Sequence, residues 1–391
     1  MSTGLRDLDP YDAVVLLSFG GPQGPEDVIP FLENVTAGRG IPRERLAEVG
    51  EHYHLFNGVS PINAQNSALT TALRTELARR GIATPVYLGN RNWRPSLVDA
   101  LRQAGADGAR RILAVTTSAY SSYSGCRQYR EDVATAIAEL ATEGTVVQVD
   151  QVRRYFNIPG FVQANVDAAT RAWYEVLDDP ADLLDIAGED WPRLVFVTHS
   201  IPIGMQETSG PGGGQYVRQH LSLADRIADL LAEHFGRPID YDLVFCSRSG
   251  PPQVPWLEPD VNDHLQDLAQ QGQRRVVLAP IGFISDHMEV AYDLDVEARA
   301  TAAEHGVRIA RASTAGTDAA FVAGLVDLLV ERAIAERTGT TTTGGPAPPA
   351  SAFAPLHDVC GRGCCPNLRA DKPAACGHPD EMPLDTVSPT G

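Results

Sequence analysis

One histidine and three carboxylates have types and spacings that could support acid–base or metal chemistry. His199 directly follows the apolar run 194–198, so we expect it at the mouth of a buried strand, where imidazole can act as a base or a metal ligand. Glu289, Asp293 and Glu297 recur every fourth residue and share one face of a helix. An imidazole opposite a carboxylate suits a divalent first-row metal. A solvated helix face explains the acidic stripe equally well, and a lone histidine is more often structural.

The cysteines form a second candidate site. Two of them, Cys126 and Cys246, lie alone in the body of the chain, whereas the last 32 residues hold Cys360, Cys364, Cys365 and Cys376. In a cytoplasm that keeps thiols reduced, such a group predicts a metal site rather than disulfides. A disordered tail is the alternative. We expect Cys246, at the end of a strand, to be a small core residue.

Composition narrows the class of protein. The chain has 391 residues, 43% of them hydrophobic, and a formal net charge of −18, which would repel a phosphate backbone or an anionic membrane surface. We therefore expect no nucleic-acid partner. The apolar runs are far shorter than a membrane span needs, and the acidic N-terminus does not resemble a secretory signal. These features predict a soluble cytoplasmic protein.

Short β-branched runs that alternate with helical patterns predict strands buried on both faces, and thus an α/β fold with parallel sheets. We expect strands at 13–18, 85–89, 111–117, 145–150, 193–198, 241–246, 274–280 and 307–312. The clearest helical stretches are 63–80, 127–141, 221–234, 261–270, 286–305 and 321–336. Two βα arrays of similar length therefore follow one another.

The residues that follow the strands predict a cleft, because ligands of open α/β sheets bind at the carboxyl ends of the strands. These segments are rich in aromatic rings and hydroxyls, with a few Arg and His, which suits a flat apolar ligand with polar groups at its rim. No glycine-rich phosphate-binding motif follows a strand, and we interpret the run 210–214 (GPGGG) as a loop.

Several motifs resemble the ferrochelatase family in type and in order. They are LLSFGGP (16–22), GVSPIN (58–63), FVTHSIP (196–202), SRSGPPQVPWLEPD (247–260) and PIGFISDHMEVAYDLDVEA (280–298). The resemblance covers roughly residues 12–335, and SGCRQY (124–129) with the cysteine tail resembles the actinobacterial, coproporphyrin-using branch. It implies two Rossmann-like domains, each with a four-stranded parallel sheet, and a porphyrin cleft between them.

The resemblance also implies roles for the acidic stripe. His199 is the family's active-site histidine and Glu289 the carboxylate opposite it; both would contact the substrate Fe²⁺, and either could take the pyrrole proton. Asp293 and Glu297 match the further acidic positions on a proton or metal path. Insertion of Fe²⁺ removes two N–H protons, so a base must lie close to the ring nitrogens.

Propionate groups need donors or cations around the rim of the cleft. The candidates for porphyrin contact are Phe19, His52, Tyr53, Ser60, Ser124, Arg127 and Tyr129. Two positions depart from relatives: Phe19 stands where several have Tyr, and Trp93 stands where some have His.

The tail adds a cofactor by the same resemblance. Some ferrochelatases hold a [2Fe-2S] cluster through three tail cysteines and one from the body, and Cys126 is at the matching place. Four of Cys126, Cys360, Cys364, Cys365 and Cys376 would ligate it. We expect vicinal Cys364 and Cys365 not to ligate together, and zinc is the competing metal.

The predicted organisation has five parts. These are an N-terminal Rossmann-like domain (1–165), a second one (166–315), a C-terminal helix (316–337), a Thr/Gly/Pro/Ala linker (338–355) and a cysteine-rich tail (356–391). The predicted reaction is insertion of ferrous iron into coproporphyrin III by a monomeric enzyme with transient contacts to haem-pathway enzymes. Alternatives are a protoporphyrin IX ferrochelatase, a cobalt or nickel chelatase of a sirohydrochlorin-type ring, and a non-catalytic tetrapyrrole carrier or iron sensor.

Overall fold

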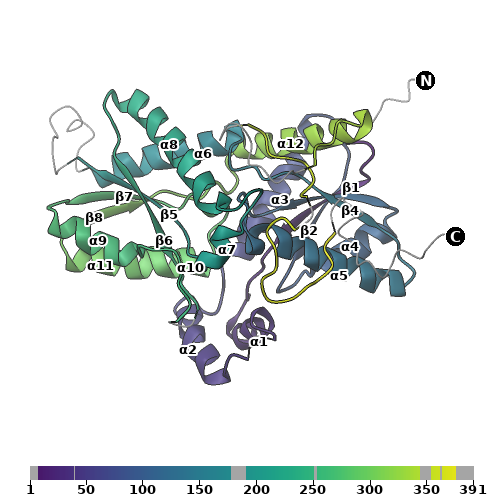
Figure 1. Cartoon of the computed structure of the whole chain (residues 1–391), viewed down its shortest axis with the longest axis horizontal. Helices are drawn as coiled ribbons and strands as arrows, with labels where there is room; N and C mark the ends of the chain where they lie inside the picture. Colours follow the sequence, from purple (N-terminus) through teal and green to yellow (C-terminus); the bar gives the residue numbers. More distant parts are fainter. Residues whose placement is uncertain are drawn as a thin grey trace.

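Eight strands form two parallel four-stranded sheets of identical topology. The computed structural model describes residues 8–38, 40–177, 191–250, 253–343, 354–361 and 363–375. The strand orders are β2-β1-β3-β4 and β6-β5-β7-β8, and the sheets lie side by side in Figure 1. The strands are β1 (Ala13–Ser18), β2 (Val86–Asn90), β3 (Arg111–Thr116), β4 (Gln148–Gln151), β5 (Arg193–His199), β6 (Tyr241–Cys246), β7 (Arg275–Ala279) and β8 (Arg308–Arg311). The predicted α/β class with two parallel sheets is confirmed.

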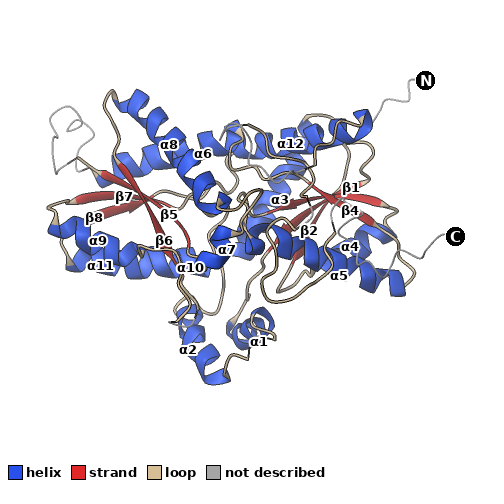
Figure 2. Cartoon of the chain, in the orientation of Figure 1, coloured by secondary structure: helices blue, strands red, loops and turns tan. Residues whose placement is uncertain are grey.

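Helices cover both faces of each sheet (Figure 2). Those of the first half are α1 (Pro25–Val35), α2 (Arg43–His54), α3 (Ile62–Arg79), α4 (Leu97–Ala106), the π-helix η1 (Tyr123–Arg127), α5 (Gln128–Thr142) and α6 (Pro159–Val176). Those of the second half are α7 (Ile203–Glu207), α8 (Gln215–Phe235), α9 (Val261–Gln270), α10 (Met288–Tyr292), the π-helix η4 (Asp293–Ala298), α11 (Arg299–Glu304) and α12 (Ala319–Thr338).

The alternation of side chains along each strand divides the core into layers. Val14 and Leu16 point into a large cluster that also contains residues of α3, α6, α8 and α12 and the inner strands of the second sheet. Val15 and Leu17 point to the opposite face, which α4 and α5 cover. In the second sheet, Val195 packs with α9, η4 and α11. One helical layer thus spans both sheets and joins the two halves.

Each sheet reverses its strand order at one point. β1 pairs with both β2 and β3, and β5 pairs with both β6 and β7. The crevice at such a switch point, outside the carboxyl ends, is where doubly wound sheets bind ligands. His199 is the last residue of β5, and the segment after β7 leads into α10, so both candidate elements of the acid–base site border the same switch point.

Some elements differ from the sequence-based expectation. The single helix expected over 286–305 consists of α10, η4 and α11. The pair α1 and α2, which we did not predict, projects away from the sheets (Figure 1). The predicted domain boundaries stay predictions, although the one after residue 165 falls inside α6. Most of the predicted linker and Cys376 lie outside the described residues. In the described part of the chain, no helix has the length and apolarity to cross a membrane.

The packing of α6 against α12 generates a prediction. A Cβ at Gly160 would lie 2.1 Å from the Ala320 carbonyl oxygen, so we expect Gly160→Ala to lower the free energy of unfolding by about 1–3 kcal/mol. The control is Gly50→Ala in α2, where the new Cβ meets only Val28 and Ile29 at 3.5 Å; alanine there should be neutral or stabilising. Chemical denaturation measures both, and equal stability of the two variants would contradict this account of the interface.

Candidate active site and metal centre

The backbone around His199 fixes the orientation of its imidazole. The His199 Nδ1–H donates to the Ser200 carbonyl oxygen, which leaves Nε2 to face Glu289. Ser200 is held in turn, because its N–H donates to the Cys246 carbonyl at 2.8 Å and its hydroxyl to the Leu257 carbonyl at 2.8 Å. Tyr216 donates to the His199 carbonyl at 2.9 Å. We did not predict this role of Tyr216, since nothing in its spacing distinguishes it from a core tyrosine.

Glu289 lies between two imidazoles. Its Oε1 is 3.5 Å from His199 Nε2, and its Oε2 is 3.3 Å from Nδ1 of His287. The exposed fractions of the His199 and Glu289 side chains are 30% and 48%, so solvent and a ligand can reach the pair. The structure therefore brings the two predicted catalytic residues together. The sequence analysis gave His287 no role of its own, although its place two residues before Glu289 was the available signal.

The acidic stripe runs through a π-helix. Four residues of an α-helix turn slightly more than a full circle, whereas four residues of the wider π-helix turn slightly less. The stripe crosses from one helix type to the other, because Glu289 lies in α10 and Asp293 begins η4. The small excess of rotation in the first and the small deficit in the second offset each other, so the three carboxylates stay on one face. The Ser247 hydroxyl donates to Asp293 from a left-handed backbone conformation with φ of 63°. Glu297 is exposed one turn further on.

The neighbouring charges separate the pKa values of this group. Burial opposes a charged imidazole, but the Glu289 carboxylate outweighs it and raises the pKa of His199 to about 9. Burial also opposes the Glu289 charge, yet His199 and His287 lower the pKa of Glu289 to about 2. Burial, with the Glu289 charge adding to it, raises the pKa of Asp293 to about 7. Near neutral pH the site thus holds an ion pair beside a carboxyl that exchanges its proton with ease.

Four of the seven rim candidates lie in or beside the α1–α2 excursion. Phe19, 37% exposed, and Tyr53 both pack edge-on or tilted against Phe31 of α1, with ring centroids 6.3 and 6.0 Å away. His52 stacks on Tyr292 of α10 at 3.9 Å. Ser60 is buried, and its N–H donates to the Pro22 carbonyl at 3.0 Å. The excursion therefore brings aromatic rings to the acidic helix.

The other three rim candidates lie in or next to η1. Ser124 is half-buried and contacts Met205 of α7. Arg127 pairs with Glu131 at 3.2 Å and donates to the Lys372 carbonyl, so its guanidinium faces the tail. Tyr129, in the first turn of α5, is buried in the core, and the Arg91 guanidinium lies 4.6 Å from its ring centroid. Of these three side chains, Tyr129 is buried and Arg127 is bound to Glu131 and the tail, whereas Ser124 is half-buried.

The described cysteines of the tail meet Cys126 in one group. The Cys126 and Cys360 sulfur atoms are 3.7 Å apart, and those of Cys364 and Cys365 are 3.9 Å apart. Hydrogen bonding to Cys360 is the main cause that raises the pKa of the Cys126 thiol, and Cys126 does the same for Cys365. All four are free thiols. Four buried or half-buried sulfur donors, each in contact with another of the group, are a fitting donor set for a thiolate-bound metal centre.

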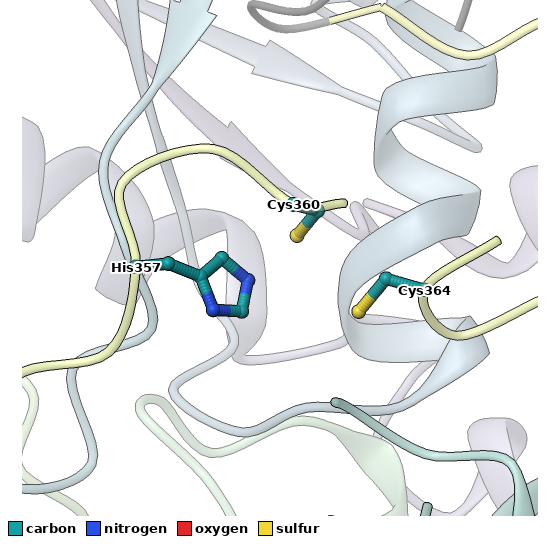
Figure 3. Close-up of side chains that lie close together, drawn as sticks. All are labelled: His357, Cys360 and Cys364. Atoms are coloured by element: carbon teal, nitrogen blue, oxygen red, sulfur yellow. The ribbon is translucent and has the colours of Figure 1, made fainter. Parts of the chain in front are cut away.

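A histidine that we did not predict joins this group. The ligand atoms of His357, Cys360 and Cys364 all lie within 4.8 Å of one another (Figure 3). Burial, together with Arg130 and Arg154, lowers the pKa of His357 to about 4, so its imidazole is neutral at physiological pH. The first turn of α5 anchors the tail, since the Arg130 backbone carbonyl accepts from the Ala375 N–H at 3.0 Å and the Glu131 carboxylate accepts from the Asn367 side chain at 3.1 Å.

Comparisons with known proteins found relatives in sequence and similar solved structures. The sequence model of the family "Ferrochelatase" matches residues 11–333. The chain is 53% identical to a coproporphyrin III ferrochelatase of Streptomyces coelicolor over 95% of this chain and 97% of the relative. It is 43% identical to a ferrochelatase of Rhodopirellula baltica, over 96% and 99% of the two chains. Among solved structures, it is similar to the sirohydrochlorin chelatase SirB from Bacillus subtilis in complex with cobalt, with a TM-score of 0.44, 11% identity and coverage of 83% and 97%.

The ion pair generates a prediction that needs no substrate. In NMR titrations of the purified protein, we expect the imidazole of His199 to titrate near pH 9, because the Glu289 carboxylate holds its proton. In Glu289→Gln the pKa of His199 should fall, since burial then acts without a counter-charge. The control is the imidazole resonance of His305, which lies outside the pair and is assigned by its loss in His305→Ala. Glu289→Gln should leave this resonance unchanged. A His199 pKa that stays the same in Glu289→Gln would contradict the pairing.

Proposed function

The chain belongs to the ferrochelatase family, and from this premise we propose that it inserts ferrous iron into coproporphyrin III. The reaction replaces two pyrrole N–H bonds by bonds to iron and releases two protons, without a redox step. The product is iron coproporphyrin, an intermediate of haem synthesis. The observation that carries the proposal is the pair of His199 and Glu289, 3.5 Å apart and open to the cleft, in a chain of this family.

We assign the roles of the site residues from their geometry. The Nε2 atom of His199 faces the cleft and takes a pyrrole proton after its resident proton has left. Glu289 contacts both His199 and His287, and its carboxylate oxygens offer ligand atoms to the incoming Fe²⁺; Nε2 of His199 could bind the metal only before it takes the pyrrole proton. Asp293, whose pKa is about 7, exchanges the proton with solvent near neutral pH, and exposed Glu297 continues this path.

The preference for coproporphyrin rests on the rim and on the relatives. Two of the relatives at about 50% identity, from Streptomyces coelicolor and Leifsonia xyli, are named coproporphyrin III ferrochelatases. Coproporphyrin carries two more propionates than protoporphyrin IX, so polar groups at the rim favour it. We propose Tyr53 and Ser124 as rim donors, because both side chains are partly exposed, and Phe19, 37% exposed, would supply an apolar ring.

We also propose that the tail group binds a [2Fe-2S] cluster. Cys126, Cys360, Cys364 and Cys365 would hold it, because among the cysteines of the described residues these are the ones that contact one another. This choice includes both vicinal cysteines, contrary to our expectation from the sequence. When bound, such a cluster supplies a one-electron redox centre. Zinc is the competing occupant.

A cytoplasmic location fits the same thiols. The five described cysteines are free, and free thiols persist in a reducing compartment. We infer that the enzyme acts there on soluble substrate.

Iron insertion is the direct test. With anaerobic Fe²⁺, we expect the purified protein to convert coproporphyrin III with a higher kcat/KM than protoporphyrin IX, as followed by Q-band absorbance. His199→Ala should lower kcat by about 10²-fold or more, because the base is lost, and should still bind porphyrin in a fluorescence titration. His305→Ala is the control. Turnover of His199→Ala close to the wild-type rate would refute the assigned base, and a preference for protoporphyrin would refute the polar rim.

The cluster is tested on the protein isolated without oxygen. We expect equal iron and acid-labile sulfide, a visible absorption band, and an electron paramagnetic resonance signal after reduction. Cys126→Ser should lose all three, because one thiolate ligand is removed. Cys246→Ser is the matched control, since Cys246 is buried at the end of β6 and is not part of the tail group. A colourless protein with bound zinc would refute the proposed cluster and would show that the tail group is a zinc site.

A further inference from the structure

A single arginine outside the cleft binds both flanks of the acidic segment. Arg311 is the last residue of β8, and its side chain is 16% exposed. Its Nε and Nη2 donate to the two carboxylate oxygens of Asp295 at 2.8 and 2.9 Å. Its Nη1 and Nη2 donate to those of Asp286 at 3.3 and 3.2 Å. One guanidinium thus joins two carboxylates from the same segment.

The hydrogen-bonding capacity of this guanidinium is fully used. Arginine has five N–H donors in a fixed plane, and the remaining one is directed at the Ala312 carbonyl at 3.3 Å. The five bonds comprise two parallel pairs to carboxylates and one to the backbone. Such bidentate pairs add directional specificity to the charge attraction. A lysine ammonium, with three donors and no plane, could keep the charge but could not reproduce the geometry.

The two aspartates bracket the residues that face the cleft. Asp286 lies three residues before Glu289, and Asp295 lies two residues after Asp293, inside η4. Asp286 is fixed further, because it accepts from the Thr314 hydroxyl at 3.1 Å and its N–H donates to Gln65 of α3 at 2.7 Å. The start of the segment is therefore tied to the first half of the chain as well as to β8.

We infer that Arg311 is a positioning residue, which holds α10 and η4 so that Glu289 faces His199 and Asp293 faces Ser247. The inference rests on the proposed function of these carboxylates. Arg311 itself does not reach the cleft residues. Its hydrogen bonds to Asp295 hold one side of η4 against β8. Asp293, two residues earlier in the same π-helix, then lies on the opposite side.

Arg311→Lys is the primary test, measured as anaerobic iron insertion. We expect kcat to fall about tenfold, because small displacements of reacting groups are costly, while KM for the porphyrin stays near the wild-type value. The matched control is Arg308→Lys on the same strand. Its guanidinium donates to the backbone carbonyls of Glu175 and Leu177, away from the acidic segment, so kcat should remain near wild type.

A double-mutant cycle separates positioning from general destabilisation. Asp295→Asn keeps the size of the side chain and should lower kcat in the same direction. Arg311→Lys already removes the paired hydrogen bonds between Arg311 and Asp295. The kcat of the double variant Arg311→Lys/Asp295→Asn should therefore be no lower than that of Arg311→Lys alone. Multiplying effects, or a wild-type kcat in either single variant, would overturn the inference. If Arg311→Lys does not fold, Asp295→Asn decides. A wild-type protein that fails to insert iron would instead refute the proposed function.

Discussion

The parallel pairing of β5 with β7 is the constraint on which the candidate active site depends. These strands are neighbours in register from Arg193 to Phe196, so their carboxyl ends open at the same edge of the sheet. His199 ends the first strand, and the segment after the second leads directly into α10. A histidine and a carboxylate ninety residues apart in the sequence are thereby brought to 3.5 Å. The close packing of both strands in one core fixes this meeting point.

The neighbouring groups then give two carboxyls of similar chemistry, Glu289 and Asp293, different pKa values. Glu289 has two imidazoles beside it, whereas Asp293 has a hydroxyl and the Glu289 charge. Burial acts to raise the pKa of both carboxyls, but these neighbours bring the pKa to about 2 for Glu289 and about 7 for Asp293. Titratable groups pushed apart in this way suit acid and base roles near neutral pH. The backbone of Ser247 is left-handed, a conformation that costs energy in a non-glycine residue. From it the Ser247 hydroxyl donates to Asp293.

The sequence predicted those features that follow from periodicity, and it missed those set by tertiary contact. Buried strands and the spacing of Glu289, Asp293 and Glu297 are local patterns, so all eight strands and the acidic face could be predicted. An α-helix and a π-helix give the same four-residue spacing, which is why the η4 segment was not foreseen. Tyr129 and Arg127 were chosen as polar residues after a strand, yet the first is covered by Arg91 and the second is bound to the tail. Only packing decides such cases.

The proposed metal centre would contribute to the folding of the short tail segment. Between 354 and 375, the buried side chains are few, namely Leu356, Val359, Cys365 and Ala374, and such a surface contributes little to folding. The crowded thiols have raised pKa values, so without a metal they must stay protonated. A metal bound at the proposed centre would replace those protons and would add its binding free energy to the folding of the tail. The tail contacts both halves of the chain: α5 binds it through Arg130 and Glu131, and the Gly210 N–H, beside α7, donates to Cys365 at 3.0 Å. The proposed centre would therefore link the two halves.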